Sequence, residues 1–79
     1  MADEKKVVYN KNAERIENNF VYHTPTDRQI AKMADIRLAA RDFAKIIDEH
    51  CPESREKSLA LTQLEDCVMW GNASIVRNE

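Results

Sequence analysis

Two histidines and two cysteines are the strongest candidates for metal binding or nucleophilic catalysis in this 79-residue chain, and they are His23, His50, Cys51 and Cys67. Their spacing matches no zinc-binding pattern, and His50 and Cys51 would share a single turn. A Cys–His nucleophile pair would require His50 to reach Cys67 through an unusual helix register. The chain also has no glycine-rich loop that would hold phosphates or a dinucleotide. We therefore expect no enzyme activity, no metal and no other cofactor.

Basic side chains recur at helical spacing in the middle of the chain. Arg37, Arg41 and Lys45 are four residues apart and share one stripe of a helix, whereas Arg28 and Lys32 form a second stripe. Most stripes of this kind are solvated faces. Arg37 is less easily explained in this way, because it also falls in an alternative apolar seam of the same helix. An arginine that faces such a seam must meet an anion.

Two sources of that anion remain open for Arg37. Glu65 or Asp66 would supply a carboxylate from within the protein. A phosphate ligand would supply it from outside, through a bidentate contact with the guanidinium group. The first source predicts a structural arginine, and the second predicts a binding site.

Aromatic and amide side chains supply further candidates. Tyr22 and His23 precede the long helix predicted below, where an aromatic residue usually fixes the chain direction but can also stack on a nucleobase. Trp70 offers the same two functions, although a tryptophan within an apolar helix is more typical of a core. Asn72 and Ser74 interrupt that apolar helix, so they either hydrogen-bond across an assembly or face a ligand.

Caps and breakers predict two long helices. Thr26 and Gln29 form a capping box, and no breaker follows before Pro52, so the first helix should cover residues 27–49. Pro52 suits the first turn of a second helix, which should continue over residues 52–76. We therefore expect an all-α hairpin of two long antiparallel helices joined by a short turn, preceded by a short N-terminal helix.

Apolar residues repeat at intervals of three and four in both predicted helices. In the second helix, further apolar residues go most of the way round, and such a helix needs cover on all sides. One partner helix cannot cover it, and a chain this short has only a marginal core. We therefore expect a homo-oligomer. The predicted seams are Ile30, Met33, Ile36, Ala40, Phe43 and Ile47, and Leu61, Leu64, Val68, Gly71 and Ile75.

Composition limits the class of protein further. Twelve Lys and Arg against 14 Asp and Glu give a net charge of -2, which excludes a generally basic nucleic-acid coat and predicts no binding to duplex nucleic acid. We expect no membrane span and no signal peptide, and two cysteines without such a signal indicate the cytosol. Asn12 is a candidate cap for a short helix over residues 13–19. The predicted organisation is a flexible N-terminus, residues 1–12, and a helical hairpin domain, residues 13–79.

Several runs of the sequence resemble one protein family. They are ENNFVYHTP at residues 17–25, Ile36 with Arg37, CPESREKSLALT at residues 51–62, Glu65, and VMWGNASIVRN at residues 68–78. These runs are similar to small phage and prophage proteins that carry the hairpin domain shared by anti-CBASS and anti-Thoeris cyclic-nucleotide sponges. The resemblance covers about residues 14–79, and CPESREKSLALT and MWGNASI are its most specific runs.

The resemblance implies binding without catalysis. Members of the family are helical hairpins that assemble into compact homo-oligomers, often hexamers built as trimers of dimers. They bind cyclic di- or trinucleotide signals of bacterial immune enzymes and do not cleave them. This chain would then act in the cytoplasm of an infected bacterial host and block CBASS-type anti-phage defence. The alternative is a small structural or adaptor hairpin of phage or prophage, without a nucleotide ligand.

The resemblance also implies which residues bind the ligand. In relatives, a tyrosine just before the long helix stacks on a base, and a basic residue about four turns later contacts phosphate. Tyr22 and Arg37 occupy these two positions. At the position of Arg37, relatives carry a lysine, which holds phosphate with a different geometry. Arg55 and Thr62 are candidates for a second pocket, on a threefold axis, that binds cyclic trinucleotides in some members. The complete predicted set is Tyr22, His23, Lys32, Arg37, Arg41, Arg55, Thr62 and Asn72.

Overall fold

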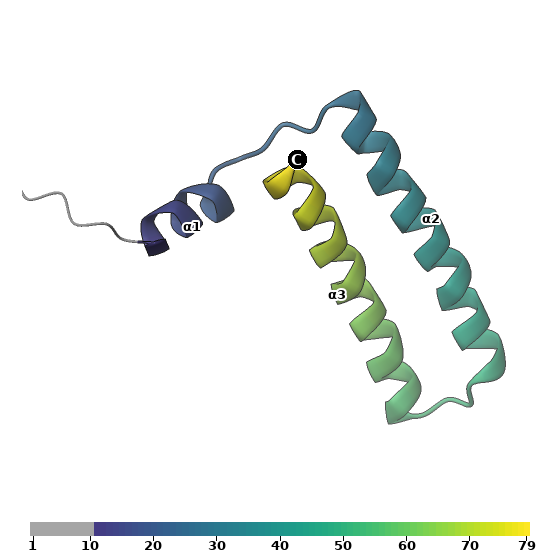
Figure 1. Cartoon of the computed structure of the whole chain (residues 1–79). Helices are drawn as coiled ribbons and strands as arrows, with labels where there is room; N and C mark the ends of the chain where they lie inside the picture. The colour runs from purple at the N-terminus through teal and green to yellow at the C-terminus, as the bar shows by residue number, and fades with distance from the viewer. Residues whose placement is uncertain (1–10) are drawn as a thin grey trace, which may run out of the picture.

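The computed structural model describes residues 11–79, which form three helices (Figure 1). Helix α1 spans Lys11–Phe20, α2 spans Asp27–His50 and α3 spans Arg55–Asn78. Helices α2 and α3 lie side by side and antiparallel, and α1 lies near the C-terminal end of α3. The described residues contain no strand, so the prediction of an all-α hairpin preceded by a short helix is confirmed.

Helix α2 begins as its capping box predicts. The Gln29 N–H donates to Thr26 Oγ1 at 3.2 Å, and the Thr26 N–H donates to Gln29 Oε1 at 3.0 Å. Both groups would otherwise lack partners at the helix start. The helix ends at His50, one residue beyond the prediction, and the Cys51 N–H still donates to the Ile47 carbonyl at 2.9 Å.

Helix α3 begins later than Pro52 predicts. Its first residue is Arg55 and its cap is Ser54, whose Oγ accepts the Lys57 N–H at 3.1 Å. The Ser54 hydroxyl also donates to the Pro52 carbonyl at 3.0 Å. The prediction that Pro52 lies in the first helical turn is therefore wrong. The physical reason is that the hydroxyl of Ser54, at the cap position, accepts a backbone N–H of the first turn. A proline at the cap has no side-chain acceptor and would leave this N–H without a partner.

The N-terminal helix is longer than predicted at both ends. It was expected over residues 13–19 but begins at Lys11, so Asn12 lies inside its first turn instead of preceding it. Two residues of the predicted N-terminal segment are thus helical, and its residues 1–10 lie outside the described part of the chain. Assignments of helix ends commonly differ by one or two residues.

The contact between α2 and α3 follows the predicted seam of α3, whose five members are all half-buried. The prediction for α2 is wrong at two positions, since about half of Ile30 and of Phe43 is exposed. At 100° per residue, these two side chains lie on opposite flanks of the stripe centred on Ala40. None of the described apolar side chains is fully buried. A single hairpin therefore has a contact surface between its helices but no closed core.

The turn between α2 and α3 is held by Lys57, the only buried residue among those described, at 9% exposure. Its Nζ lies 2.6 Å from Glu53 Oε1 and 2.9 Å from Asp48 Oδ1. The same nitrogen donates to the Asp48 carbonyl oxygen at 3.1 Å. The hydrogen bonds that Lys57 donates to Glu53 and Asp48 raise its pKa above the ordinary value. This ammonium group ties the last turn of α2 to the first turn of α3.

The open end of the hairpin is closed by two longer side chains of α2. Lys32 Nζ lies 2.5 Å from Glu79 Oε2, and Gln29 Nε2 donates to the Ile75 carbonyl at 3.4 Å. The hydrogen bond from Lys32 lowers the pKa of the Glu79 carboxyl. The hairpin is thus fastened by polar contacts at both of its ends.

Candidate functional site

A groove of about 830 Å³ runs along one side of the hairpin, between its two fastened ends. Half-buried apolar residues from both helices form its floor, and exposed charged residues form its rim. Its volume lies within the range of about 300–1,000 Å³ found for small-molecule sites. The floor consists of Ala40, Ala44, Leu61, Leu64 and Val68, and the rim consists of Arg37, Arg41, Lys45, Asp48, Glu49 and Glu65.

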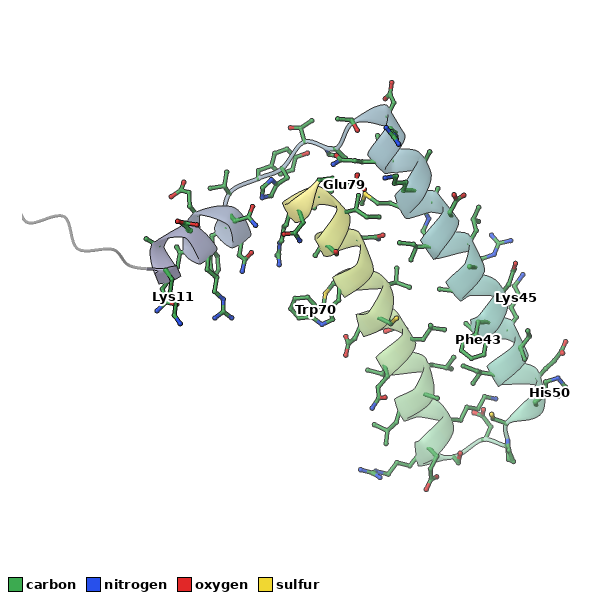
Figure 2. The ribbon with its side chains drawn as sticks, viewed as in Figure 1. Lys11, Phe43, Lys45, His50, Trp70 and Glu79 are labelled. Carbon is green, nitrogen blue, oxygen red and sulfur yellow. The ribbon has the colours of Figure 1, made fainter. Side chains whose placement is uncertain are left out.

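Helical spacing explains why the charges meet at this groove. Arg37, Arg41 and Lys45 follow each other at intervals of four, so they form one line along the flank of α2. In an antiparallel pair, the matching flank of α3 carries Glu65. Figure 2 shows Lys45 on the side of α2 that is turned away from α3, which agrees with its place at the outer edge of the rim.

The two arginines of the rim have no ionic partner among residues 11–79. The ion pairs among residues 11–79 are those of Lys57 at the turn and Lys32 at the open end, and neither Arg37 nor Arg41 takes part in one. Glu65 lines the same groove without pairing with Arg37, and Asp66 does not line it. Of the two anion sources left open by the sequence, a carboxylate from the same chain is therefore not engaged. Two guanidinium groups remain available above an apolar floor.

The predicted aromatic residues lie outside this groove. Tyr22 is 82% exposed, in the extended segment between α1 and α2. His23 is half-buried, and its Nε2–H donates to the Asn18 carbonyl at the end of α1 at 2.6 Å. Arg37 is ten residues into α2, about 15 Å along the helix at 1.5 Å per residue. One chain therefore does not bring Tyr22 together with Arg37.

The remaining predicted residues are dispersed over the hairpin. Lys32 is engaged by Glu79 at the open end. Arg55 and Thr62 are exposed on α3, Arg55 as its first residue. Asn72 is half-buried, and its Oδ1 is enclosed without a hydrogen-bond partner. Of the eight predicted residues, the structure thus places Arg37 and Arg41 in one groove and does not bring the others to it.

Sequence reasoning left Lys45 out of the predicted ligand-binding set, although it lines the groove. The spacing in the sequence could have identified Lys45, because it continues the stripe of Arg37 and Arg41 by one further turn. The carboxylates Glu49 and Glu65 also line the rim, and nothing in their spacing distinguishes them from other exposed acids. Their place in the groove depends on the register between α2 and α3.

A second hollow of about 240 Å³ lies where α1 approaches the C-terminal end of α3. Two amides of α1, Asn18 and Asn19, contribute to it from one side. The α3 side contains Trp70, which is 62% exposed. The other α3 residues that line it are Ala73, Ser74, Arg77 and Asn78. This hollow is mainly polar, in contrast to the apolar floor of the larger groove.

Two kinds of feature are absent from the described part of the chain. No group of three or more His, Cys, Asp or Glu side chains between residues 11 and 79 is arranged to hold a metal ion. Within the same range, no helix has the length and apolar character needed to cross a bilayer.

Comparison with known proteins gives one match. A family model described as "Acb2/Tad1, hairpin domain" matches residues 12–76. The matched region contains all of α2 and nearly all of α1 and α3, so the groove lies entirely within it. Comparisons with curated proteins and with solved structures returned no match.

Proposed function

The chain belongs to the Acb2/Tad1 hairpin-domain family, the anti-CBASS and anti-Thoeris cyclic-nucleotide sponges, and on this basis we propose that it sequesters a cyclic di- or trinucleotide immune signal without cleaving it. It does so in the cytoplasm of an infected bacterial host and thereby blocks CBASS-type anti-phage defence. The working form is a homo-oligomer, a hexamer built as a trimer of dimers. Family membership supports cyclic-nucleotide binding in general terms, and the particular signal and assembly belong to the proposal.

The observation that carries the proposal is a pair of unengaged arginines, Arg37 and Arg41, beside an apolar floor. A guanidinium group binds a phosphate through two parallel hydrogen bonds, and the faces of nucleobases are apolar enough to lie on aliphatic side chains. A cyclic dinucleotide presents both kinds of group within one small molecule. The groove offers the complementary surfaces side by side.

The symmetry of the ligand favours a site between two copies of the chain. A cyclic dinucleotide has two phosphates and two bases, and a twofold axis would supply two copies of Arg37 and of Tyr22. Each charge-assisted contact contributes roughly 1.5–3 kcal/mol, and each stacked base contributes roughly 1–3 kcal/mol. At the upper limit of these ranges, two of each sum to about 12 kcal/mol, which is the binding free energy of a nanomolar complex before the cost of ordering is deducted. The exposed Tyr22 ring is free to act in this way.

Arg55 and Thr62 are our candidates for a second kind of pocket, which would take cyclic trinucleotides. Both side chains are exposed on α3 and neither lines the larger groove. A trinucleotide site formed by them is therefore independent of Arg37. The substitution Arg55→Ala should weaken trinucleotide binding and leave dinucleotide binding unchanged, and the opposite pattern would remove Arg55 from the second pocket.

One observation favours a different function, that of a small structural or adaptor hairpin without a nucleotide ligand. Three carboxylates, Asp48, Glu49 and Glu65, share the rim of the groove with the three basic residues. In a protein complex, side-chain rotation would let Glu49 and Glu65 neutralise basic residues of the rim, whereas Asp48 already pairs with Lys57. An adaptor would then respond to a protein partner and would not respond to cyclic nucleotides.

Thermal unfolding with and without a panel of cyclic di- and trinucleotides separates these functions. A ligand at 100 times its Kd stabilises the native state by about 2.7 kcal/mol, so Tm should rise by roughly 10 °C or more in a domain this small. Calorimetric titration gives the affinity, and light scattering gives the mass of the assembly. The matched control is the linear dinucleotide with the same bases.

Two outcomes would contradict the proposal. The first is an unchanged Tm with every cyclic nucleotide, together with a mass equal to the 9.2 kDa of one chain. The second is chemical change of the ligand, because a sponge releases its ligand intact when it is denatured by heat. Chromatography of the released ligand tests this second point directly.

A further inference from the structure

Helix α1 carries an apolar stripe that is left exposed by the described part of its own chain. Ala13, Ile16 and Phe20 follow at intervals of three and four and lie on one face of the helix. All three are exposed, and Phe20 is 83% exposed. A helix of ten residues is at most marginally stable by itself in water. We call these three residues the arm stripe. Helix α1 requires a surface on which this stripe can pack in order to be stable.

The hairpin of the same chain is not that surface. Where α1 approaches α3, it contributes the half-buried amides Asn18 and Asn19 to the small hollow. The facing part of α3 contributes the polar residues Ser74, Arg77 and Asn78 and, beside them, Ala73 and one edge of Trp70, which stays 62% exposed. Helix α1 therefore turns polar residues towards its own hairpin and leaves the arm stripe exposed.

The exposed apolar residues of α3 offer a matching surface. Met69 is 54% exposed and Trp70 is 62% exposed. Figure 2 shows Trp70 on the side of α3 that faces away from α2, towards the region where α1 lies. We propose that α1 is an assembly arm, which docks its arm stripe on Met69 and Trp70 of a second copy of this chain. This inference rests on the homo-oligomer proposed above and adds which segments join its copies.

The segment between α1 and α2 is long enough for such an exchange. Residues 21–26 are without helical structure, and six extended residues reach about 20 Å. Neighbouring helices pack with their axes about 8–10 Å apart. The arm can therefore pass the edge of its own hairpin and reach the next one. The hydrogen bond from His23 to the Asn18 carbonyl joins the first half of this segment to α1, so these residues would move together with the arm.

A second copy fits this surface better than an unrelated partner does, because the exchange is reciprocal. Around a twofold axis, each arm covers the other chain, so the buried area is counted twice. Each fully buried aromatic side chain contributes about 150–250 Å², and the exposed fractions of Phe20 and Trp70, 83% and 62%, leave roughly 400–700 Å² to be buried in two chains. Ile16, Met69 and their surroundings bring the total buried area towards that of a small specific interface, which is about 1,200 Å².

The exchange would also explain why Tyr22 and Arg37 are far apart within one chain. Tyr22 lies two residues after the arm stripe, so it moves with the arm towards the neighbouring hairpin. The arm would thus carry the predicted stacking residue of one chain to another chain. A ligand site made in this way would be incomplete in an isolated copy.

The first test removes the arm stripe and leaves the hairpin unchanged. The double variant Ile16→Ser/Phe20→Ser should dissociate at a concentration at least tenfold higher than the wild-type chain, as measured by light scattering. Trp70 is the single tryptophan, so its fluorescence should shift to longer wavelength as the arm leaves it. The matched control, Glu14→Ser/Arg15→Ser, alters the same helix at unchanged net charge and should behave as wild type.

The second test distinguishes exchange between chains from docking within a chain. In a background without Cys51 and Cys67, one preparation carries Phe20→Cys and another carries Met69→Cys. After mixing and mild oxidation, a disulfide-linked dimer of the two variants should form. If the mixture gives no such dimer, while a chain with both substitutions forms an internal disulfide, the arm packs on its own hairpin and the inference is overturned.

The outcomes of these tests separate the arm from the sponge function. If the arm-stripe variant keeps the wild-type mass and fluorescence, the arm inference fails, whereas cyclic-nucleotide binding by the wild-type oligomer still stands. If the wild-type protein binds no cyclic nucleotide but the mixed disulfide forms, the sponge proposal fails and the arm inference stands. Circular dichroism shows whether each variant retains the helices of the hairpin.

Discussion

Two regions of the hairpin place basic side chains beside carboxylates, with opposite results. At the turn, Lys57 is 9% exposed and lies within 2.9 Å of both Glu53 and Asp48. In the groove, Arg37 and Arg41 are exposed and form no ion pair with any described residue, although Glu65 lines the same cavity. The first cation is fully used by the fold. The other two are left for something that the single chain does not contain.

The difference has a structural cause. Lys57 follows Glu53 by four residues, and the tight turn brings the end of α2 back to it, so two carboxylates and a carbonyl oxygen converge on one nitrogen. The groove arginines project instead from the flank of a straight helix, where only the neighbouring helix offers acids. The comparison indicates that engaged charges mark the scaffold of this protein and that unengaged charges mark its site.

Loss of a groove arginine should have the strongest consequence for ligand binding. Arg37→Ala should weaken cyclic-dinucleotide binding about a hundredfold to ten-thousandfold, because a twofold site loses two contacts of roughly 1.5–3 kcal/mol each. Unfolding without ligand should change little, since exposed substitutions usually alter stability by no more than about 0.5 kcal/mol. Calorimetric titration and thermal unfolding of the same preparation measure both quantities.

Arg28→Ala is the matched control for this substitution, because Arg28 is an exposed arginine of α2 that does not line the groove. It should retain wild-type affinity apart from a small general electrostatic loss. Arg37→Lys should keep part of the affinity, since lysine holds phosphate as a point charge without the bidentate geometry. If Arg37→Ala also breaks the oligomer, Arg37 is a structural residue and the proposed site is wrong.

Loss of the turn lysine should mainly lower thermal stability. Lys57→Met should lower Tm by roughly 5–10 °C, because two carboxylates and a carbonyl oxygen lose their shared partner at the turn. Below the melting transition, the affinity for ligand should stay within about twofold of wild type. Lys45→Met is the control, since Lys45 has no ion pair within the described chain. Equal losses of Tm in the two variants would show that the contacts of Lys57 at the turn do not stabilise the fold more than an unpaired lysine does.

The same lysine gives a prediction for alkaline pH. The pKa of Lys57 is raised above 10.5 by Glu53 and Asp48, so its stabilising contribution is complete below pH 10.5 and is lost as pH rises through the raised value. The difference in Tm between wild type and Lys57→Met should therefore be constant from about pH 8 to 10 and shrink at higher pH. A difference that shrank already near pH 8 would contradict the observed contacts.

Local rules in the sequence predicted most of the scaffold. The capping box of Thr26 and Gln29 and the α3 seam depend on residues close in the chain, and both are as expected. The start of α3 was mispredicted because Pro52 and Ser54 both suit a helix start, and only the closed turn decides between them. Local rules thus failed first where the chain reverses direction.

The site was less predictable, because its parts depend on register and on other chains. That Arg37 and Arg41 share a cavity with Glu65 depends on how α2 is aligned against α3, and sequence spacing within one helix does not determine this alignment. The same holds for the contact of Lys57 with Asp48, nine residues earlier. The position of Tyr22 relative to Arg37 depends further on how copies of the chain assemble.

The weakest consequence is expected for Lys32, which is both a scaffold residue and a predicted ligand residue. Lys32 is a predicted ligand residue, yet Glu79 engages it at the open end. The pKa of Glu79 is lowered by Lys32 from its ordinary 4.5, so the stabilisation is present above that pH and is lost as pH falls through the lowered value. Because exposed pairs contribute little, Glu79→Gln should lower Tm by only about 1–2 °C at pH 7 and by nothing near pH 2. The same substitution frees Lys32, so ligand binding should become severalfold tighter if this ammonium group reaches a phosphate, and an unchanged Kd would assign Lys32 to the scaffold alone.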